Sequence, residues 1–251
     1  MNTSLIGRRC ALLTAATLLA APALGQIANR DTLIERLNAL GVRVFGQPVT
    51  AETLPRLVSI VISASHGAQL TDVDMAMLAE LPQLTTLSMA RLALVTPAGF
   101  AQLVRLPALR SLAISSSHMD AARVSALVGM PALISLNLHA NSGLTNDAMP
   151  GFGAMRLLQS LAISSTAVTD AGLAALADHP AMTGLSLSQL RGVTDAGMPH
   201  LARMPRLTEI NLAGTGIVGG GIGVLASLAG LRTLTLSQTI VDDAAMPQWR
   251  G

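Results

Sequence analysis

Apolar residues recur along this chain in units of nearly constant length. A Leu-Pro dipeptide or a close variant marks each unit, and successive marks lie 24 to 27 residues apart. The marks are Leu54-Pro55, Leu81-Pro82, Leu106-Pro107, Met130-Pro131, Met155-Arg156, His179-Pro180, Met204-Pro205 and Leu228-Ala229. A fixed period of this length indicates a repeat protein, in which each unit packs against its neighbours.

Each unit contains the pattern of one strand followed by one short helix. An apolar triplet spaced L-x-x-L-x-L begins three residues after each mark, as in Leu84, Leu87 and Met89. The alternation at its end predicts a strand with one buried face. A Thr or Asp then precedes apolar residues at helical spacing, which predicts a capped helix on the opposite side of the unit. The predicted caps are Thr71, Thr96, Asp120, Thr145, Thr169, Thr194 and Asp242.

A small polar residue lies between strand and helix in several units. It is eight positions past the first Leu of the triplet, at Ser117, Asn141, Thr166, Thr215 and Thr239. Because a buried side chain of this kind can bond the loop backbone, we expect it to hold the loop and to be shared between neighbouring units.

The motif Val-Thr-Asp-Ala-Gly occurs twice, at 168–172 and 193–197. With eight units in phase over about 54–246, the chain resembles leucine-rich repeat proteins, and this motif resembles those of the ribonuclease-inhibitor-like class, which includes the repeats of F-box substrate adaptors. The resemblance implies an α/β fold: a curved, horseshoe-like solenoid with a parallel sheet on the concave face and short helices on the convex face. It also implies a protein-binding scaffold.

The segments outside the repeats have separate predictions. Residues 31–40 have the spacing of a helix, so residues 26–53 are predicted to form an N-terminal helical cap, and residues 54–251 the repeats with a short C-terminal cap. Trp249 is the candidate lid of the last repeat. Without such a lid, the C-terminal end is a candidate dimer contact.

Residues 1–25 are predicted to be a secretory signal peptide. Arg8-Arg9 precede an apolar run over 10–21, and small residues precede a predicted cut after Gly25. The run is shorter than the roughly 20 residues that span a bilayer, so no stable membrane span is expected in the mature chain. Export by the Sec or the twin-arginine route predicts a periplasmic or secreted bacterial protein.

Removal of the signal peptide changes the charge and the chemistry of the chain. All 16 basic residues are Arg, and the mature chain retains 14 of them against 14 Asp and Glu. A formally neutral chain with few aromatic residues does not predict nucleic-acid binding. The only cysteine, Cys10, lies in the signal peptide, so no thiol chemistry, metal or cofactor is predicted.

Gly214, Gly216 and Gly219 have the G-x-G-x-x-G spacing of a dinucleotide-binding turn. The repeat register, however, places them at the strand-to-helix corner of one unit, and the next strand is followed by Ser237-Gln238 instead of an acidic residue. We therefore predict that these glycines form an ordinary corner of the repeat and not a dinucleotide site. Because Val218 replaces the Thr cap and glycine weakens helices, residues 218–223 are predicted to be the least regular helix.

The remaining polar residues do not form a recognisable catalytic set. The repeated acids each lie in a first helical turn, where the amide dipoles favour negative charge, so we predict a capping role for Asp72, Asp147, Asp170, Asp195 and Asp243. The five histidines share no repeat position and no metal-ligand spacing. No G-x-S-x-G element is present.

The outward positions of the predicted sheet are small, hydroxylated and nearly uncharged. The least ordinary of them, and therefore the candidate partner-binding residues, are Arg91, Asn137, His139, Glu209 and Asn211. Tight protein interfaces usually centre on Trp, Tyr or Arg. Either the partner supplies such anchors, or binding uses an edge or the convex side.

The sequence as a whole predicts a non-catalytic, exported scaffold for an unknown protein partner. The alternatives are a secreted effector or adaptor acting on host proteins and, third, an enzyme of unknown type.

Overall fold

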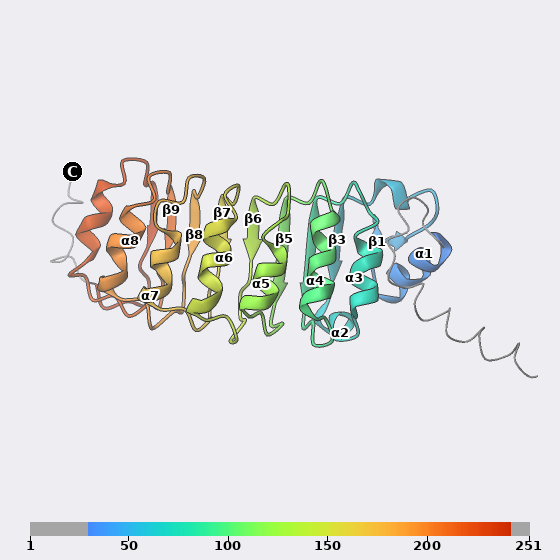
Figure 1. Ribbon diagram of the computed structural model, residues 1–251, viewed down its shortest axis with the longest axis horizontal. Helices are drawn as coiled ribbons and strands as arrows, with labels where there is room; N and C mark the ends of the chain where they lie inside the picture. Colours follow the sequence, from blue (N-terminus) through green and yellow to red (C-terminus); the bar gives the residue numbers. More distant parts are fainter. Residues whose placement is uncertain (1–29, 242–251) are drawn as a thin grey trace, which may run out of the picture.

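The protein is an elongated solenoid of two layers, one of strands and one of helices (Figure 1). The structure, a computed structural model, describes residues 30–241. The predicted signal peptide, the cap at Asp242, Asp243 and the proposed lid Trp249 therefore lie outside the described residues, and so does the dimer contact that depends on that lid.

The strands form one parallel sheet in which each strand pairs with the equivalent strand of the next repeat. Equivalent leucines are in register along the sheet, as Leu87, Leu112, Leu136 and Leu161 show. The eight strands of the described sheet are β3 (Ser59–Ile62), β4 (Thr86–Ala90), β5 (Ser111–Ser115), β6 (Ser135–Asn137), β7 (Ser160–Ala162), β8 (Gly184–Ser186), β9 (Glu209–Asn211) and β10 (Thr233–Thr235). Each repeat unit forms one coil of the solenoid, and a coil is named after its strand.

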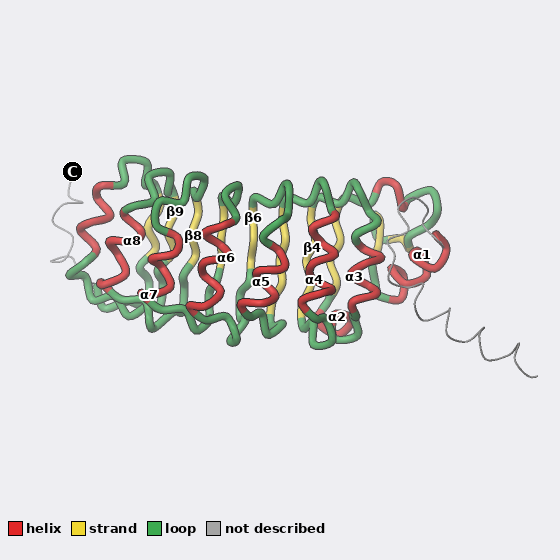
Figure 2. Tube along the Cα trace, viewed as in Figure 1, coloured by secondary structure: helices red, strands yellow, loops and turns green. Residues whose placement is uncertain are grey.

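Short helices form the second layer and cover one face of the sheet (Figure 2). The α-helices are α2 (Ala64–Gly67), α3 (Asp72–Leu78), α4 (Pro97–Gln102), α5 (Ala121–Leu127), α6 (Met149–Ala154), α7 (Asp170–Leu173) and α8 (Met198–Ala202). The 3-10 helices are η2 (Leu54–Arg56), η3 (Leu103–Arg105), η4 (Asn146–Ala148), η5 (Ala174–Leu176), η6 (Asp195–Gly197) and η7 (Ile222–Ser227). The triplet side chains, together with Phe100 and Phe152, fill the space between the layers.

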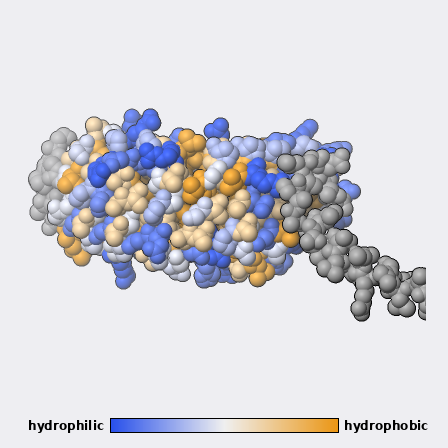
Figure 3. Space-filling model, in the orientation of Figure 1, coloured by the Kyte–Doolittle hydropathy of each residue, from blue (hydrophilic) through white to orange (hydrophobic). Residues whose placement is uncertain are grey.

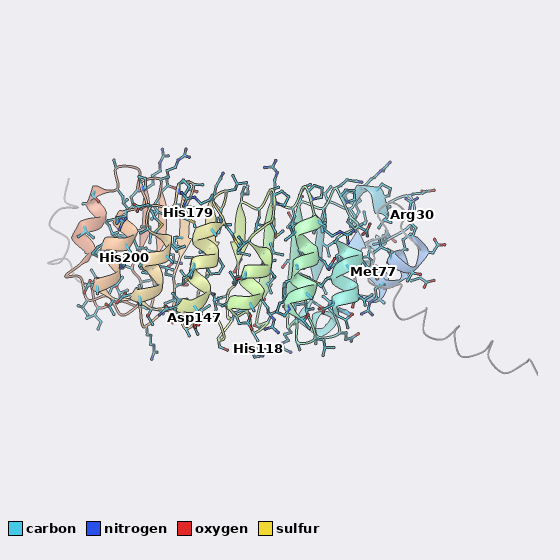
Figure 4. All side chains as sticks on the ribbon, in the orientation of Figure 1. Arg30, Met77, His118, Asp147, His179 and His200 are labelled. Carbon is cyan, nitrogen blue, oxygen red and sulfur yellow. The ribbon has the colours of Figure 1, made fainter. Side chains whose placement is uncertain are left out.

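The two long edges of the solenoid differ in what they contain. The lower edge in Figure 4, where strands end and helices begin, carries the labelled His118 and Asp147. The upper edge, where helices end and strands begin, carries the labelled His179. We define the upper edge as residues 51–58, 79–85, 104–110, 128–134, 154–159, 177–183, 202–208 and 227–232.

Every strand from β4 onward is followed by a residue in the left-handed region of backbone conformation. These corner residues are Arg91, Ser116, Ala140, Ser165, Gln189, Gly214 and Gln238, with φ between 49° and 66°. Because glycine adopts this conformation without strain, Gly214 suits its corner. The first glycine of the G-x-G-x-x-G stretch is thus one member of a repeated turn.

The neighbouring glycines allow two coils to approach closely. A Cβ atom on Gly216 would lie 2.6 Å from the carbonyl oxygen of Arg191, and one on Gly221 would lie 2.4 Å from that of Asp195. The glycine-rich stretch is therefore accounted for by packing. The helix of this coil begins only at Ile222 and is a 3-10 helix throughout, so the predicted irregularity of residues 218–223 is confirmed.

The repeated acids tie each coil to the next. Asp170 accepts hydrogen bonds from the backbone N–H (2.8 Å) and the hydroxyl (2.6 Å) of Thr194, one coil further on. Asp72 does the same for Thr96, and Asp195 accepts from the backbone N–H groups of Val218 and Gly219. The predicted position of each acid in a first helical turn is confirmed. The hydrogen bonds of these carboxylates go to the helix start of the following coil, which was not predicted.

Asp147 also lies in a first helical turn as predicted, but its neighbour makes the inter-coil bonds. Asn146 accepts from the Thr169 N–H and donates to the Thr169 hydroxyl, both at 2.9 Å. An amide thus bonds the same two groups as Asp72 and Asp170 do, with the direction of the hydroxyl bond reversed.

These inter-coil bonds explain the glycine of the Val-Thr-Asp-Ala-Gly motif. A Cβ atom on Gly172 would lie 2.5 Å from Oδ1 of Asn146, and one on Gly197 would lie 2.4 Å from Oδ1 of Asp170. The glycine of the motif is therefore explained by packing, because the acid or amide of one coil lies against the glycine of the next coil.

The small polar residues behind the strands divide into two groups. Asn141 is fully buried, and its Oδ1 accepts the backbone N–H of Ser117, whose hydroxyl in turn accepts that of Leu92. These bonds cross between coils as predicted. In the other group, the hydroxyl donates to a carbonyl of its own coil, at Thr166, Thr215 and Thr239.

Residues ahead of the repeats pack onto the same core. α1 (Arg30–Ala39) lies where the helix over 31–40 was predicted, and β1 (Arg43–Val44) pairs antiparallel with β2 (Gln47–Pro48). Arg36 of α1 donates to both carboxylate oxygens of buried Asp74 in α3, at 2.5 and 3.0 Å. Burial alone would raise the pKa of Asp74, but the bonds from Arg36 and Thr71 outweigh it and lower that pKa.

The inter-coil bonds predict opposite outcomes for two substitutions of Asp170. Asp170→Ala removes both bonds to Thr194 and should lower the free energy of unfolding by about 2 kcal/mol, at about 1 kcal/mol for each bond. Asp170→Asn should lower it by less than about 0.5 kcal/mol, because Asn146 bonds the same two groups of its Thr. Urea unfolding would measure both. Asp147→Ala is the control, and equal losses for the Ala and Asn variants would contradict the assignment.

Candidate partner-binding face

The outer face of the sheet, away from the helices, is lined by small side chains. From β3 to β10 the outward residues are Ser, Thr, Ala, Asn, Val, Gly and one Glu. Glu209 is the one ionisable side chain that these strands present outward, and it is exposed. A single carboxylate on an otherwise neutral, hydroxyl-bearing surface is the chemical feature that distinguishes this face.

A shallow hollow of about 220 Å³ lies beside this carboxylate. It crosses β7 to β10, and its side chains are Ser160, Ala162, Ser186, Glu209, Asn211, Thr233 and Thr235. Gly184 lies in register between Ser160 and Glu209. Because Gly184 has no side chain where other coils have Ser or Thr, the face is recessed there.

A row of serine hydroxyls fixes one wall of the hollow. The hydroxyl of Ser188 donates to that of Ser164 at 2.8 Å, and the Ser164 and Ser186 hydroxyls are 3.0 Å apart. Ser164 is buried among these hydroxyl groups. The bonds hold Ser186 in place beside Gly184.

The two asparagines among the candidate residues have the same local role. Asn137 and Asn211 end β6 and β9, and each Oδ1 accepts the backbone N–H two residues later, from His139 and Ala213, at 3.0 Å. They occupy the same register, three strand spacings apart, which is about 14 Å. The amide NH₂ of Asn211 has no acceptor in the described part of the chain, and Asn211 lines the hollow.

Arg91 and His139 lie outside this hollow. Arg91 is the exposed corner residue after β4 and lines a separate recess of about 290 Å³ on the lower edge, with Ser116 and His118. Its strand is five spacings from that of Glu209, about 24 Å. His139 is exposed beyond the end of β6.

The five candidates are therefore not one site. The structure brings together Glu209 and Asn211, and it adds residues that were not singled out from the sequence: Ser160, Gly184, Ser186, Thr233 and Thr235. Gly184 could have indicated the recess from the sequence alone, because every other coil has a side chain at this outward position.

The histidines do not gather with other ligands. His118, His179 and His200 lie in different coils (Figure 4). Within residues 30–241, no three His, Cys, Asp or Glu side chains are grouped as a metal site would require. In the same range, no helix has the length and apolar content needed to cross a bilayer.

His179 has a structural role on the upper edge. It replaces the Leu or Met of the repeat mark and is 1% exposed. Its Nε2 lies 3.1 Å from the carbonyl oxygen of Met155, and its Nδ1 accepts the Met182 N–H at 3.2 Å, an arrangement that requires a neutral ring. Burial lowers the pKa of His179, against the opposing effect of the bond to Met155.

Comparisons with known proteins support the architecture. No family model matches the sequence, and no curated protein matches it. Among solved structures, internalin C2 from Listeria monocytogenes str. 4b F2365 matches with a TM-score of 0.59 and 20% identity, over 86% of this chain and 88% of that chain. The TLR13–ssRNA13 complex matches with a TM-score of 0.49 and 18% identity, over 79% of this chain and 35% of that chain. The likeness to internalin C2 confirms the predicted fold, a leucine-rich repeat solenoid.

The buried His179 predicts a loss of stability in mild acid. Because its pKa is lowered in the folded state, the unfolded chain binds the proton first, so the free energy of unfolding should fall as the pH drops below about 6.5. Thermal or urea unfolding between pH 7 and 5 would measure this slope. His179→Leu should reduce the slope, whereas His200→Leu should leave it unchanged. An unchanged slope in the His179 variant would show that another group is responsible.

Proposed function

We propose that this protein is a non-catalytic scaffold that binds a protein partner on the outer face of β7–β10, with Glu209 receiving a basic side chain. The observation that carries the proposal is the recess at Gly184, which places the face's one carboxylate beside hydroxyl and amide groups. A guanidinium or ammonium group contains several N–H donors, and Glu209 and the surrounding hydroxyls are acceptors. Open solenoid faces are suited to such contacts.

The recess determines how much such a contact contributes. A fully exposed ion pair contributes about 0.2–1 kcal/mol, because solvent and salt screen the charges. Hydrogen bonds to charged groups that exclude water contribute about 1.5–3 kcal/mol. A basic side chain lying in the recess is partly shielded from solvent, so we expect the second range to apply.

The neutral surroundings also favour a basic group over other ligands. No outward cation lies in the strands β3–β10, so an anionic group would meet Glu209 without compensation. Asn211 contributes a free NH₂ group that can bind a carbonyl of the partner's backbone. The proposed partner therefore presents an Arg or Lys with accessible backbone beside it.

The adaptor and effector alternatives are not supported by a separate observation. They rest on the resemblance of the Val-Thr-Asp-Ala-Gly motif to ribonuclease-inhibitor-like repeats, and the contacts of Gly172 and Gly197 explain that motif by packing. The scaffold role needs no such additional assumption.

Two substitutions in the recess test the proposed partner contact. Glu209→Gln removes the charge and Gly184→Leu fills the space, and each should weaken capture of a partner isolated with the wild-type protein at least tenfold, since 1.4 kcal/mol is a factor of ten. Gly184→Leu should fold normally, because a Cβ atom there has no neighbour closer than 3.7 Å. Titration calorimetry with the purified partner would give the affinities.

Matched controls come from the same sheet. Ser135→Leu adds the same side chain at the same register in β6, and Arg91→Gln removes a charge outside the recess. Both should leave the affinity within about twofold. If the Glu209 and Gly184 variants bind as the wild type does, the partner face lies elsewhere on the solenoid.

We also propose that residues 1–25 direct export to the periplasm or the medium. The support is the sequence pattern of a charged start, a short apolar run and small residues before Gly25. Mass spectrometry of the protein from the native host should show a mature chain beginning near Gln26. Full-length protein starting at Met1 in the soluble cytoplasmic fraction would contradict export.

A further inference from the structure

Arginines and carboxylates are separated between the two edges of the solenoid. The upper edge holds seven arginines, at positions Arg56, Arg105, Arg110, Arg156, Arg203, Arg206 and Arg232. Its carboxylates are Glu52, Glu80 and Asp178. The acids that join successive coils, Asp72, Asp170 and Asp195, lie at the helix starts, on the lower edge. A nearly neutral chain thus has one strongly basic edge, and hydrophilic residues are visible along it in Figure 3.

Several of these arginines have no carboxylate partner in the described chain. Arg105 pairs with Glu80, and Arg203 pairs with Asp178. The other five, Arg56, Arg110, Arg156, Arg206 and Arg232, are exposed, and within residues 30–241 no carboxylate lies at ion-pair distance from any of these five. The free charge therefore lies in the coils of β3, β5, β7, β9 and β10.

Three of these arginines, Arg110, Arg156 and Arg206, lie in alternate coils. The β5, β7 and β9 coils are two strand spacings apart, so successive arginines are about 10 Å apart along the solenoid. Three residues of an extended or polyproline-like chain also span about 10 Å. An extended segment with an acid at every third residue can therefore meet each arginine in turn.

An apolar recess lies between the first two of these arginines. It measures about 170 Å³ and lies between the β6 and β7 coils, where Met130, Leu133, Ala154 and the exposed Leu157 form its walls and Arg156 its rim. The β6 coil has no charged residue on the upper edge, and Arg110 precedes β5 on its other side. A cavity of about 150 Å³ holds a benzene molecule, so this recess has room for one apolar side chain.

We propose that the upper edge is a second interaction surface, which binds an acidic, extended polypeptide segment carrying an apolar side chain. Arginine pairs with carboxylates through two parallel hydrogen bonds, and the recess between Arg110 and Arg156 receives the apolar group. Single-stranded nucleic acid fits less well, because no aromatic side chain lies on this edge for bases to stack upon. This surface is distinct from the recess at Glu209, which lies on the sheet face and has the opposite charge.

Three synthetic peptides separate charge from apolar anchoring. The first is a fluorescently labelled 12-residue peptide of repeated Asp-Leu-Ser, and the others replace either Asp by Asn or Leu by Ser. The Asp-Leu-Ser peptide should bind the full mature protein and bind less tightly as NaCl is raised. The Asn peptide should bind at least tenfold more weakly, and the Ser peptide at an intermediate level. Failure of the Asp-Leu-Ser peptide to bind at low salt would overturn the proposal.

Protein variants with equal net charge locate the site. The triple variant Arg110→Gln, Arg156→Gln, Arg206→Gln should weaken binding of the Asp-Leu-Ser peptide at least tenfold. The matched triple Arg43→Gln, Arg91→Gln, Arg191→Gln removes the same charge elsewhere and should change it less than threefold. Equal losses in both would show attraction by net charge alone and would contradict a site. Circular dichroism checks that both variants fold.

Two further measurements test the recess and the kind of partner. Ala154→Met fills the recess, so it should weaken binding of the Asp-Leu-Ser peptide at least threefold. It should leave the affinity for the Asp-Ser-Ser peptide unchanged. Glu209→Gln should leave the affinity for both peptides unchanged. Failure of the proposed partner contact at Glu209 is therefore distinguishable from failure of the proposed peptide site on the upper edge. Tighter binding to phosphatidylglycerol vesicles than to the acidic peptide would overturn the peptide assignment in favour of a lipid surface.

Discussion

Successive coils approach one another to the spacing of paired strands, and this contact decides most of the repeat pattern. The backbone bonds of the sheet hold one side of each coil, and the bonds from Asp72, Asn146, Asp170 and Asp195 hold the other. The approach is close enough that Gly172 and Gly197 leave no room for a side chain. Because each coil contacts only its neighbours, the same contact has to be made again at every repeat.

Because the units repeat, side chains at equivalent positions lie side by side along the solenoid. Both proposed sites lie where a residue differs from the equivalent residues of the neighbouring coils. The sheet face has Ser or Thr at the register of Gly184 and Glu209 in its other coils, so the change at two adjacent strands produces both a recess and a charge. On the upper edge, the β6 coil lacks charge between the arginines of its neighbours. In both cases the chemistry depends on adjacent coils differing from one another.

The fold was predictable in detail, and the candidate sites were predictable only in part. The period, the strands and the helix positions follow from apolar spacing, which depends on each residue's own coil. The first-turn position of Asp170 was predicted correctly, but its hydrogen-bond partner, Thr194, was not, because that residue is one coil away. The prediction for Asp147 followed its charge, whereas the amide of Asn146 makes the inter-coil bonds. Arg91 and Glu209 were grouped by residue type, although five strand spacings separate them.

The sequence by itself determined the solenoid, because a repeated pattern of buried and exposed positions leaves only one way to stack the units and bury their apolar faces. It also determined which side chains point outward from the sheet, because side chains alternate along a strand. Only the tertiary structure decided which of those residues share a recess and which edge the arginines occupy. These are contacts between coils, set by strand register and by corner conformation, and residues 24 or 25 positions apart in the chain become neighbours through them.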